Sequence, residues 1–227
     1  MIYAGIVAGG TGTRMGTDIP KQYLKLGDVT VLERCAGKFL SAEKIAVVYI
    51  AVHESRILEV EKMFAKYGRR VRIVKAGETR NDTLVNIVEA VFAENEVSGD
   101  DILLTHDAAR PFVSGRIIEE NIAAAIEFGV CTTALRATDT MLVSSDGETV
   151  SETPDRNTLF HAQTPQSFKL RLFREIYSTL SDSEKAGLTD VCGIFSAKGV
   201  PVHIVEGERE NFKLTSPIDL KLAETLI

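Results

Sequence analysis

Short apolar segments alternate with longer segments of helical period along most of the chain. In the longer segments, apolar side chains recur every three or four residues, as on the buried face of an amphipathic helix. The short segments predict strands over residues 2–8, 45–52, 71–75, 102–106 and 201–205. The longer segments predict helices over residues 54–67, 79–95, 115–128, 169–180, 189–198 and 216–227. This alternation implies right-handed crossovers and therefore a doubly wound, mostly parallel α/β sheet of Rossmann-like type.

Residues 138–155 interrupt this alternation. Two short segments, 140–143 and 149–151, flank a polar turn that contains Asp146-Gly147. An Asp-Gly pair between two such segments is a hairpin signal. An antiparallel arm of this kind covers a site or contacts a second subunit, and the alternative is a surface hairpin that does neither. We predict a single domain over residues 1–227 that carries a β-hairpin arm over residues 138–155.

Composition narrows the class of protein without naming a function. The chain has 227 residues, 44% of them apolar, and a formal net charge of −6, which argues against a nucleic-acid-binding surface. The longest apolar run, near residues 45–52, is too short to span a membrane, and the first residues lack the pattern of a secretory signal. The three cysteines are odd in number and lack metal-binding spacing. We therefore expect a cytoplasmic protein that contacts neither membrane nor nucleic acid.

A glycine-rich loop follows the first predicted strand. It begins Ala8-Gly9-Gly10-Thr11-Gly12, and two cations, Arg14 and Lys21, lie within it or just beyond it. Glycine-rich backbone after a strand can surround a phosphate chain, although structural turns of this kind are also common. The spacing fits neither the dinucleotide-binding fingerprint nor the P-loop. Two cations beside a phosphate chain are what nucleotidyl transfer requires, because negative charge grows on the attacked phosphorus and the leaving oxygens.

Two more polar clusters follow predicted strands, where ligands bind in open parallel sheets. The first spans residues 77–83, and its alternative interpretation is helix capping by Thr79 or Asn81, with Arg80 in solvent. The second contains Asp107, which is well placed to hold Mg²⁺ or a sugar hydroxyl. In that cluster we expect Arg110 to serve as scaffold beside a carboxylate and His106 to be a packed histidine rather than a base.

A fourth polar cluster occupies the last third of the chain. It comprises residues 155–157, 161–166, 189–190 and 211–213. An arginine, a lysine and two threonine hydroxyl groups in this cluster can together hold a second phosphate. The sequence therefore predicts an acceptor that carries a phosphate of its own.

Five ordered motifs resemble one family over essentially the whole chain. They are AGG-x-G-x-R-M-G…PKQ, HDAARP, DRN…HAQTPQ-x-F, TD and N-x-K-x-T. The chain resembles the cytidylyltransferases that act on 2-C-methyl-D-erythritol 4-phosphate and those that act on ribitol 5-phosphate. This resemblance implies that a substrate phosphate attacks the α-phosphorus of CTP, with Mg²⁺ present and pyrophosphate leaving.

The same resemblance implies a role for each matching residue. Arg14 and Lys21 would stabilise the transition state, and Arg156 and Lys213 would hold the acceptor phosphate, so that these four form the catalytic set. The nucleotide would contact Val7, Ala8, Gly9, Gly10, Thr11, Gly12, Gly77, Glu78, Arg80, Asn81 and Thr83. The acceptor would contact Asp107, Thr140, Arg156, Thr164, Thr189 and Lys213, with Asp107 also near the metal. The family is typically a homodimer whose arms cross, so that Thr140 and Arg156 serve the neighbour's site.

The motifs divide between the two acceptors. HDAARP and DRN-x-L-x-HAQTPQ resemble the methylerythritol enzymes, although Phe160 stands where those usually carry Trp. The MIYAGI start, RNDT at residues 80–83 and LTD-x-C at residues 188–192 look more like the ribitol enzymes, and the methylerythritol pattern would have TDEA or TDDA from Thr189. The sequence-based prediction leans to methylerythritol phosphate, for isoprenoid precursors, with ribitol phosphate, for teichoic acid or capsule, as the alternative.

Two other functions compete with a cytidylyltransferase. A sugar-1-phosphate nucleotidylyltransferase that uses another base has a related glycine-rich loop, but the later DRN and NFK motifs suit a small phosphorylated polyol. A nucleotide-binding regulatory protein without catalysis is the second. The presence of every candidate catalytic residue, Arg14, Lys21, Asp107, Arg156 and Lys213, argues against it.

Overall fold

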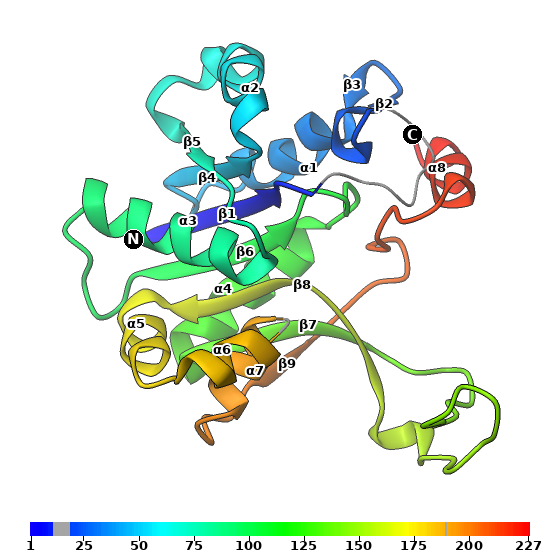
Figure 1. Ribbon diagram of the computed structural model, residues 1–227. Coiled ribbons are helices and arrows are strands. Elements are labelled where there is room, and N and C mark those ends of the chain that lie inside the picture. Colours follow the sequence, from blue (N-terminus) through cyan, green and yellow to red (C-terminus); the bar gives the residue numbers. More distant parts are fainter. Residues whose placement is uncertain (11–18, 189) are drawn as a thin grey trace.

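A computed structural model describes residues 1–10, 19–188 and 190–227 (Figure 1). Its centre is a seven-stranded sheet in the order β5-β4-β1-β6-β8-β7-β9. The strands are β1 (Ile2–Ala8), β4 (Val47–Val52), β5 (Val71–Lys75), β6 (Ile102–Asp107), β7 (Val130–Arg136), β8 (Phe160–Lys169) and β9 (His203–Glu206). Only β8 runs antiparallel to its neighbours β6 and β7, and the other pairs are parallel. The predicted mostly parallel sheet is confirmed.

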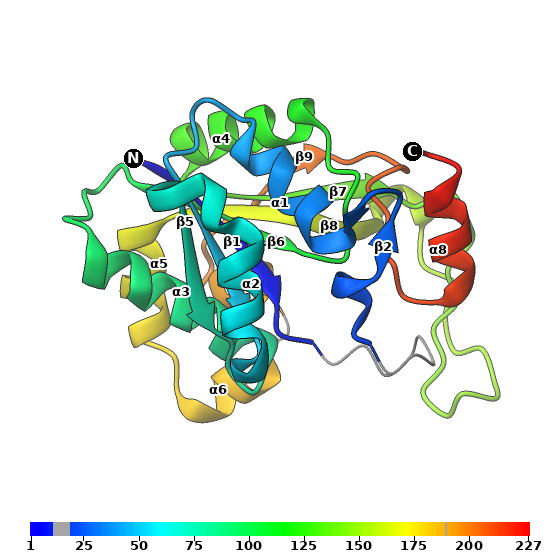
Figure 2. The ribbon, with the colours of Figure 1, turned by 90° about the horizontal axis from the view of Figure 1, so that it is seen from above.

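Helices cover both faces of the sheet. They are α1 (Val31–Leu40), α2 (Ile57–Phe64), α3 (Arg80–Glu94), α4 (Gly115–Phe128), α5 (Leu170–Ser178), α6 (Asp182–Gly187), α7 (Val191–Ser196) and α8 (Pro217–Glu224). Apolar residues of α1, α2 and α4 pack in one core, and those of α3, α5 and α7 in a second. Along β1, Tyr3 belongs to the second core and its neighbour Ala4 to the first, because successive strand residues face opposite sides. Figure 2 shows the two layers, with α1 and α4 on one side and α3 and α5 on the other.

Short elements complete the chain. They are the 3₁₀ helices η2 (Lys21–Tyr23), η3 (Glu54–Arg56), η4 (Ala65–Arg70) and η5 (Arg156–Thr158), and the two-stranded β2 (Lys25–Leu26) and β3 (Val29–Thr30). A third apolar cluster, which includes Leu26, Val31, Leu214 and Ala223, packs α8 against β2 and the start of α1. This cluster fixes the C-terminal part of the chain beside the carboxyl end of β1.

The sequence-based prediction lacks strands β7 and β8 of the sheet and helices α1 and α6. It assigned no strand to β7 or β8, because β8 carries many polar side chains and a proline in place of an apolar run. The helix predicted over residues 54–67 is divided into η3, α2 and the start of η4, and η4 itself is interrupted at Gly68, whose φ is 52°. The missed strands complete the sheet between β6 and β9.

The arm, residues 138–155, extends away from the sheet between β7 and β8 (Figure 1). The chain reverses around Asp146, whose carboxylate accepts hydrogen bonds from the backbone of Glu148 and Thr149. One isolated bridge, Val143 to Glu152, and hydrogen bonds from Ser151 to the Val143 carbonyl oxygen join the two sides. The structure has no strand over 140–143 or 149–151, so those two predicted strands are wrong. An isolated pair of strands is marginally stable in water because no further strand or helix covers it.

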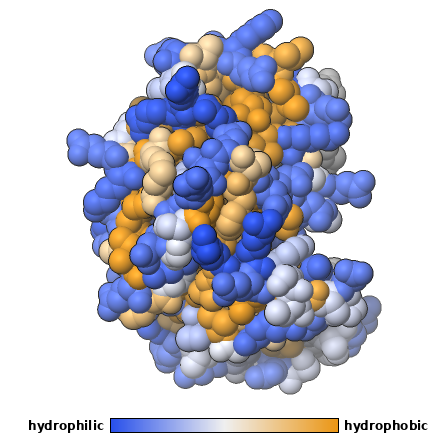
Figure 3. Space-filling view, turned by 90° about the vertical axis from the view of Figure 1, so that its left-hand side faces the viewer, coloured by the Kyte–Doolittle hydropathy of each residue, from blue (hydrophilic) through white to orange (hydrophobic). Residues whose placement is uncertain are grey.

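No helix in the described part of the chain is long and apolar enough to cross a membrane. On the face that carries the N-terminus and α5, hydrophilic residues cover much of the surface, with hydrophobic patches between them (Figure 3). The arm exposes four apolar side chains as well. They are Met141, Leu142, Val143 and Val150.

Candidate active site

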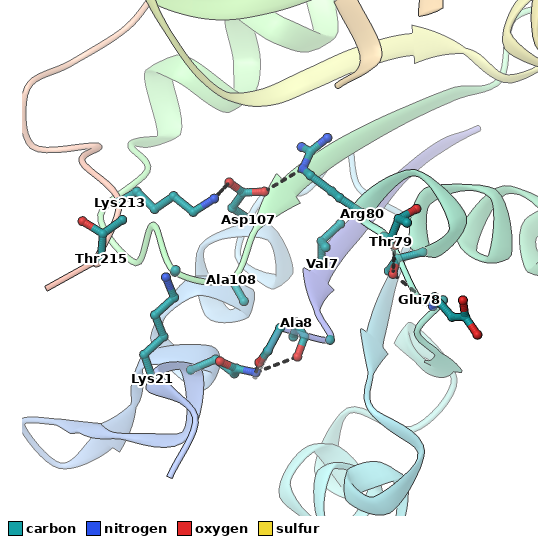
Figure 4. A pocket seen from close by; sticks show the side chains of 16 residues that line it. Val7, Ala8, Lys21, Glu78, Thr79, Arg80, Asp107, Ala108, Lys213 and Thr215 are labelled. Carbon is teal, nitrogen blue, oxygen red and sulfur yellow. Dashed lines mark hydrogen bonds and ion pairs between the residues drawn. The ribbon is translucent and has the colours of Figure 1, made fainter. Parts of the chain in front are cut away.

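A cavity of about 340 Å³ lies at the carboxyl ends of β1 and β6 (Figure 4). Eleven of the predicted site residues line it: Val7, Ala8, Gly9, Gly10, Lys21, Gly77, Glu78, Arg80, Thr83, Asp107 and Lys213. Five lining residues were not predicted: Gln22, Thr79, Ala108, Ala109 and Thr215. Segments that lie far apart in the sequence therefore meet where an open parallel sheet places its ligands.

Gln22 holds the glycine-rich loop where it leaves β1. Its buried side-chain nitrogen Nε2 donates hydrogen bonds to the carbonyl oxygens of Ala8, at 2.8 Å, and Gly10, at 2.7 Å. One amide group thus links the last residue of β1 to the start of the glycine-rich loop beside the cavity. The signal for Gln22 was its position directly after Lys21, but only the fold shows that its side chain turns inward.

Two glycines permit close approach of backbone beside the cavity. A Cβ atom on Gly9 would lie 2.4 Å from the Cβ atom of Ala76, and one on Gly77 would lie 2.3 Å from that of Asp82. The hydroxyl group of Thr83 accepts a hydrogen bond from the Gly77 N–H group at 3.0 Å and donates one to the Thr79 carbonyl oxygen at 2.9 Å. Thr83 therefore shapes the loop before α3 through two hydrogen bonds to backbone groups.

The first turn of α3 faces the cavity. Thr79, and not Asn81, caps this 15-residue helix, because its hydroxyl group accepts a hydrogen bond from the Asp82 N–H group. Unpaired N–H groups at a helix start favour an anion nearby. Arg80, the first helical residue, adds a formal positive charge at the same place. The alternative of a solvated Arg80 is wrong, because its guanidinium reaches Asp107 across the cavity.

Asp107 is the centre of a charged cluster. Lys213 Nζ lies 2.7 Å from one carboxylate oxygen, Arg80 Nε 3.2 Å from the other, and Arg110 Nε 4.0 Å from the group (Figure 4 shows the first two). Burial alone would raise the pKa of Asp107, but Arg80, Lys213 and Arg110 hold it well below its ordinary value. One negative charge against three positive charges leaves this side of the cavity positive, which suits a phosphate.

These residues do not fit a metal ion held by the protein. Both oxygens of Asp107 already contact cations. The described residues contain no group of three His, Cys, Asp or Glu side chains that could hold a metal. Mg²⁺ keeps several waters and is bound mainly through substrate phosphates and one or two carboxylates. The geometry thus argues against direct coordination by Asp107, and its metal role stays a prediction.

His106 and Thr164 form a buried support under Asp107. The Asp107 N–H group donates to the Thr164 hydroxyl oxygen at 3.1 Å, and the same hydroxyl lies 2.9 Å from Nδ1 of His106. Nε2 of His106 lies 3.0 Å from the carbonyl oxygen of Arg110. From these contacts we assign the proton to Nε2, so that Thr164 donates to Nδ1. Burial lowers the pKa of His106 to about 4, and the packed histidine is confirmed.

The other predicted site residues that the structure describes, Asn81, Thr140, Arg156 and Thr164, do not line this cavity. Asn81 is buried and donates to the Leu188 carbonyl oxygen at 2.6 Å, and the Thr164 hydroxyl group is engaged with His106 and Asp107. Thr140 and Arg156 are exposed on the arm or directly after it. Within one chain, then, Arg156 and Lys213 do not converge on one phosphate. Thr11, Gly12, Arg14 and Thr189 lie outside the described residues.

Comparisons with known proteins agree over the whole chain. The family model described as IspD, 2-C-methyl-D-erythritol 4-phosphate cytidylyltransferase, matches residues 2–227. A ribitol-5-phosphate cytidylyltransferase of Streptococcus pneumoniae serotype 2 is 41% identical over 232 residues, which cover 100% of this chain and 99% of that protein.

Solved structures show the same similarity. The 2-C-methyl-D-erythritol 4-phosphate cytidylyltransferase of Francisella tularensis superposes with a TM-score of 0.84 at 27% identity, over 100% of this chain and 99% of that chain. The corresponding enzyme of Thermus thermophilus has a TM-score of 0.77 at 29% identity, over 100% and 98%. Together with the cavity, these matches establish that the chain is a cytidylyltransferase and belongs to the 2-C-methyl-D-erythritol 4-phosphate cytidylyltransferase family.

Proposed function

We propose that this enzyme transfers a cytidylyl group from CTP to a polyol phosphate and releases pyrophosphate. The observation that supports this most is the cavity itself, where a glycine-rich turn and the cations Lys21, Arg80 and Lys213 surround one space. A triphosphate carries negative charge along its length, and cations on the protein must compensate this charge. A pyrophosphate-release assay with each of the four nucleoside triphosphates tests the proposal, and turnover with a nucleotide other than CTP as the preferred substrate would contradict it.

The reaction forms one phosphorus–oxygen bond and breaks another. An oxygen of the acceptor phosphate attacks the α-phosphorus of CTP, and the bond from this phosphorus to the bridging oxygen breaks, so that pyrophosphate leaves with the electron pair. Negative charge grows on the oxygens around the α-phosphorus. We assign its stabilisation to Lys21, which points into the cavity, and to Arg14 (Figure 4 shows Lys21). Gly9 and Gly10 let the backbone approach the phosphates closely.

The acceptor phosphate would meet Lys213 beside Asp107. Lys213 occupies the same cavity as the glycine-rich loop, so a phosphate held by its ammonium group lies near the nucleotide. Asp107 keeps Lys213 and Arg80 in place before the substrates bind. We assign no Mg²⁺ ligand to the protein. A Mg²⁺ requirement is tested by removing the ion with EDTA and restoring it.

We propose ribitol 5-phosphate as the acceptor, with methylerythritol phosphate as the alternative. The 41% identity to a ribitol-5-phosphate cytidylyltransferase favours ribitol. The RNDT and LTD-x-C segments also look ribitol-like, and the hydrogen bond from Asn81 to the Leu188 carbonyl oxygen places them side by side. Asn81 directly follows Arg80, which contacts Asp107. Sequence features that are 107 residues apart thus form one neighbourhood near the cavity.

Competition between the two acceptors tests this assignment. Ribitol 5-phosphate carries one more hydroxyl group and no methyl branch. A site built to bind a hydroxyl group can reject an analogue without it by about 10⁴-fold or more. We expect kcat/KM for ribitol 5-phosphate to exceed that for methylerythritol phosphate. The reverse order would restore the acceptor that the sequence motifs favoured.

We propose further that the enzyme is a homodimer whose arms complete the neighbouring sites. The arm exposes apolar side chains, and Arg156, the first residue of η5 after the arm, lies off the cavity of its own chain. Two-fold symmetry would cover both arms with one type of contact. In this proposal residues 1–227 form a single domain, and Thr140 and Arg156 act on the partner's substrate. The cytoplasm, which supplies CTP and suits free cysteines, is the proposed location.

A further inference from the structure

We propose that Asn211 is a positioning residue that sets the place of Lys213 in the active site. The proposal rests on the proposed function in one respect, the assignment of Lys213 to the acceptor phosphate. Asn211 and Lys213 belong to an irregular segment, residues 207–216, that joins β9 to α8. Because neither a helix nor a strand fixes this segment, its conformation depends on individual hydrogen bonds to neighbouring segments, and several of these come from side chains.

The side chain of Asn211 attaches the segment to β8. It is completely buried, and its Nδ2 atom donates to the Gln163 side-chain oxygen at 3.0 Å and to the Thr164 carbonyl oxygen at 2.8 Å. Gln163 in turn donates to the Glu208 carbonyl oxygen at 2.8 Å. Two neighbouring residues of β8 therefore hold the segment just before Lys213.

The backbone of the same segment is attached to the loop after β6. The carbonyl oxygen of Asn211 accepts a hydrogen bond from Arg110 Nη1 at 2.8 Å, and the Leu214 N–H group donates to the Ala109 carbonyl oxygen at 2.8 Å. Lys213 is thus held two residues before and one residue after its own position. Both attachments lead to residues 109 and 110, which lie two and three positions after Asp107.

These contacts connect the backbone that bears Lys213 to the backbone that bears Asp107. Thr164 supports the N–H group of Asp107 with its hydroxyl and holds Asn211 with its carbonyl oxygen. A lysine side chain is long and flexible, so the backbone that bears it decides which positions its charge can reach. A misplacement of about 1 Å in an active site can lower the rate by about 100-fold. Asn211 acts on the reaction through Lys213 and touches no substrate.

A double-mutant cycle separates positioning from simple loss of stability. The variants are Asn211→Ala, Lys213→Ala and the double variant, and the readouts are kcat/KM for the acceptor and the Kd for CTP by calorimetry. We expect Asn211→Ala to lower kcat/KM by about tenfold to 100-fold, with the Kd for CTP changed less than about twofold. In the Lys213→Ala background the same substitution should cause no further loss, because the residue it positions is gone.

Asn121→Ala is the matched control. Asn121 is also completely buried, and its Nδ2 atom also donates two hydrogen bonds, to the Ile117 carbonyl oxygen and the Thr133 hydroxyl group. None of its partners lines the cavity. The Asn121→Ala variant should lower the melting temperature as Asn211→Ala does and leave kcat/KM for the acceptor near the wild-type value. If Asn211→Ala fails to fold, Gln163→Met removes one partner of Asn211 while the bond to Thr164 remains, and the cycle is repeated with it.

Each outcome has one meaning. Losses that add in the double variant, or an equal loss of kcat/KM in Asn121→Ala, would overturn the positioning role and leave the proposed function intact. An unchanged kcat/KM for the acceptor in Lys213→Ala would instead overturn the assignment of Lys213 to the acceptor phosphate, and the positioning role with it. A loss of kcat/KM in Asn211→Ala that does not recur in the Lys213→Ala background, with near-wild-type kcat/KM in Asn121→Ala, supports both the positioning role and the assignment of Lys213.

Discussion

The cavity and the arm are built by opposite means. At the cavity, buried groups such as Gln22, Thr164 and Asn211 each use several hydrogen bonds to fix neighbouring backbone. In the arm, one isolated bridge and the hydrogen bonds from Ser151 to Val143 join the two sides, and apolar side chains such as Leu142 and Val150 are 58% exposed. One chain by itself determines the conformation of the cavity, whereas the apolar side chains of the arm have no surface that covers them in the described part of the chain.

This difference divides the predicted functional residues into two groups. Lys21, Asp107 and Lys213 converge in one cavity of one chain, but Thr140 and Arg156 do not reach it. The nucleotide half of the reaction therefore needs no partner in our proposal, and the acceptor half does. Binding of CTP and turnover should respond differently to changes in the two regions.

The largest effect is expected from Lys21→Ala. Loss of one preorganised charge at the reacting phosphorus should raise the barrier by about 3–4 kcal/mol, or about two to three decades in kcat. Lys21 lines the polar cavity and not an apolar core, so the melting temperature should change little. Lys25→Ala, at an exposed position four residues later, is the control. Near-normal kcat in Lys21→Ala at saturating CTP would remove this residue from the mechanism.

Arg156→Ala should weaken the acceptor and spare CTP. A hydrogen bond to a charged group contributes about 1.5–3 kcal/mol, so kcat/KM for the acceptor should fall by about tenfold to 100-fold. Arg69→Ala, another exposed arginine, is the control. Calorimetry that shows an equal loss of CTP affinity would contradict the division between the two regions.

Mixing the Lys21→Ala and Arg156→Ala variants sharpens that test. If arms cross, a dimer of one Lys21→Ala chain and one Arg156→Ala chain contains one complete site and one doubly defective site. Since about half of the randomly mixed dimers are of this kind, the mixture should recover about one quarter of the wild-type rate. Recovery of no activity after mixing would show that each arm serves its own chain.

Shortening the arm should separate assembly from nucleotide binding. Replacing residues 138–155 by a tight turn, with Arg156 retained, removes the exposed apolar side chains and leaves the sheet intact. We expect a folded monomer that binds CTP with wild-type affinity and loses at least as much acceptor kcat/KM as Arg156→Ala, because Thr140 is removed and Arg156 no longer meets a partner's site. Analytical ultracentrifugation at micromolar concentration gives the oligomeric state. A fully active wild-type monomer in that experiment would disprove arm-mediated dimerisation.

The smallest effect concerns pH and tests the cavity region alone. The pKa of His106 is about 4 in the folded chain, below the ordinary 6.5, so the unfolded state binds more protons between these values. Stability from this group is present above pH 6.5 and is lost as the pH falls towards 4, with a slope of at most about 1.4 kcal/mol per pH unit. His106→Gln should flatten the slope of the unfolding free energy in this window. An unchanged slope would show that His106 is not the group responsible.

Periodicity in the sequence was enough to predict most of the fold. Strands β1 and β5 and helix α4 agree with prediction to the residue, because their apolar residues recur at the period of a strand or a helix and pack against the core. Strand β8 was not predictable in this way. Its polar residues, such as Gln163 and Thr164, are buried and hydrogen-bonded to other polar groups. These hydrogen bonds form only once distant segments have folded together.

The site divides in the same manner. The sequence by itself determined which chemistry is present, because Gly9, Lys21 and Asp107 are recognisable from their residue type and their place after strands. Only the tertiary structure decided what each group does. It turned Gln22 inward and engaged the Thr164 hydroxyl within the protein, and it brought Lys213 to Asp107 from 106 residues away. Hydrogen bonds and ion pairs act over a few ångströms in space, and spacing along a chain does not encode that distance until the sheet has formed.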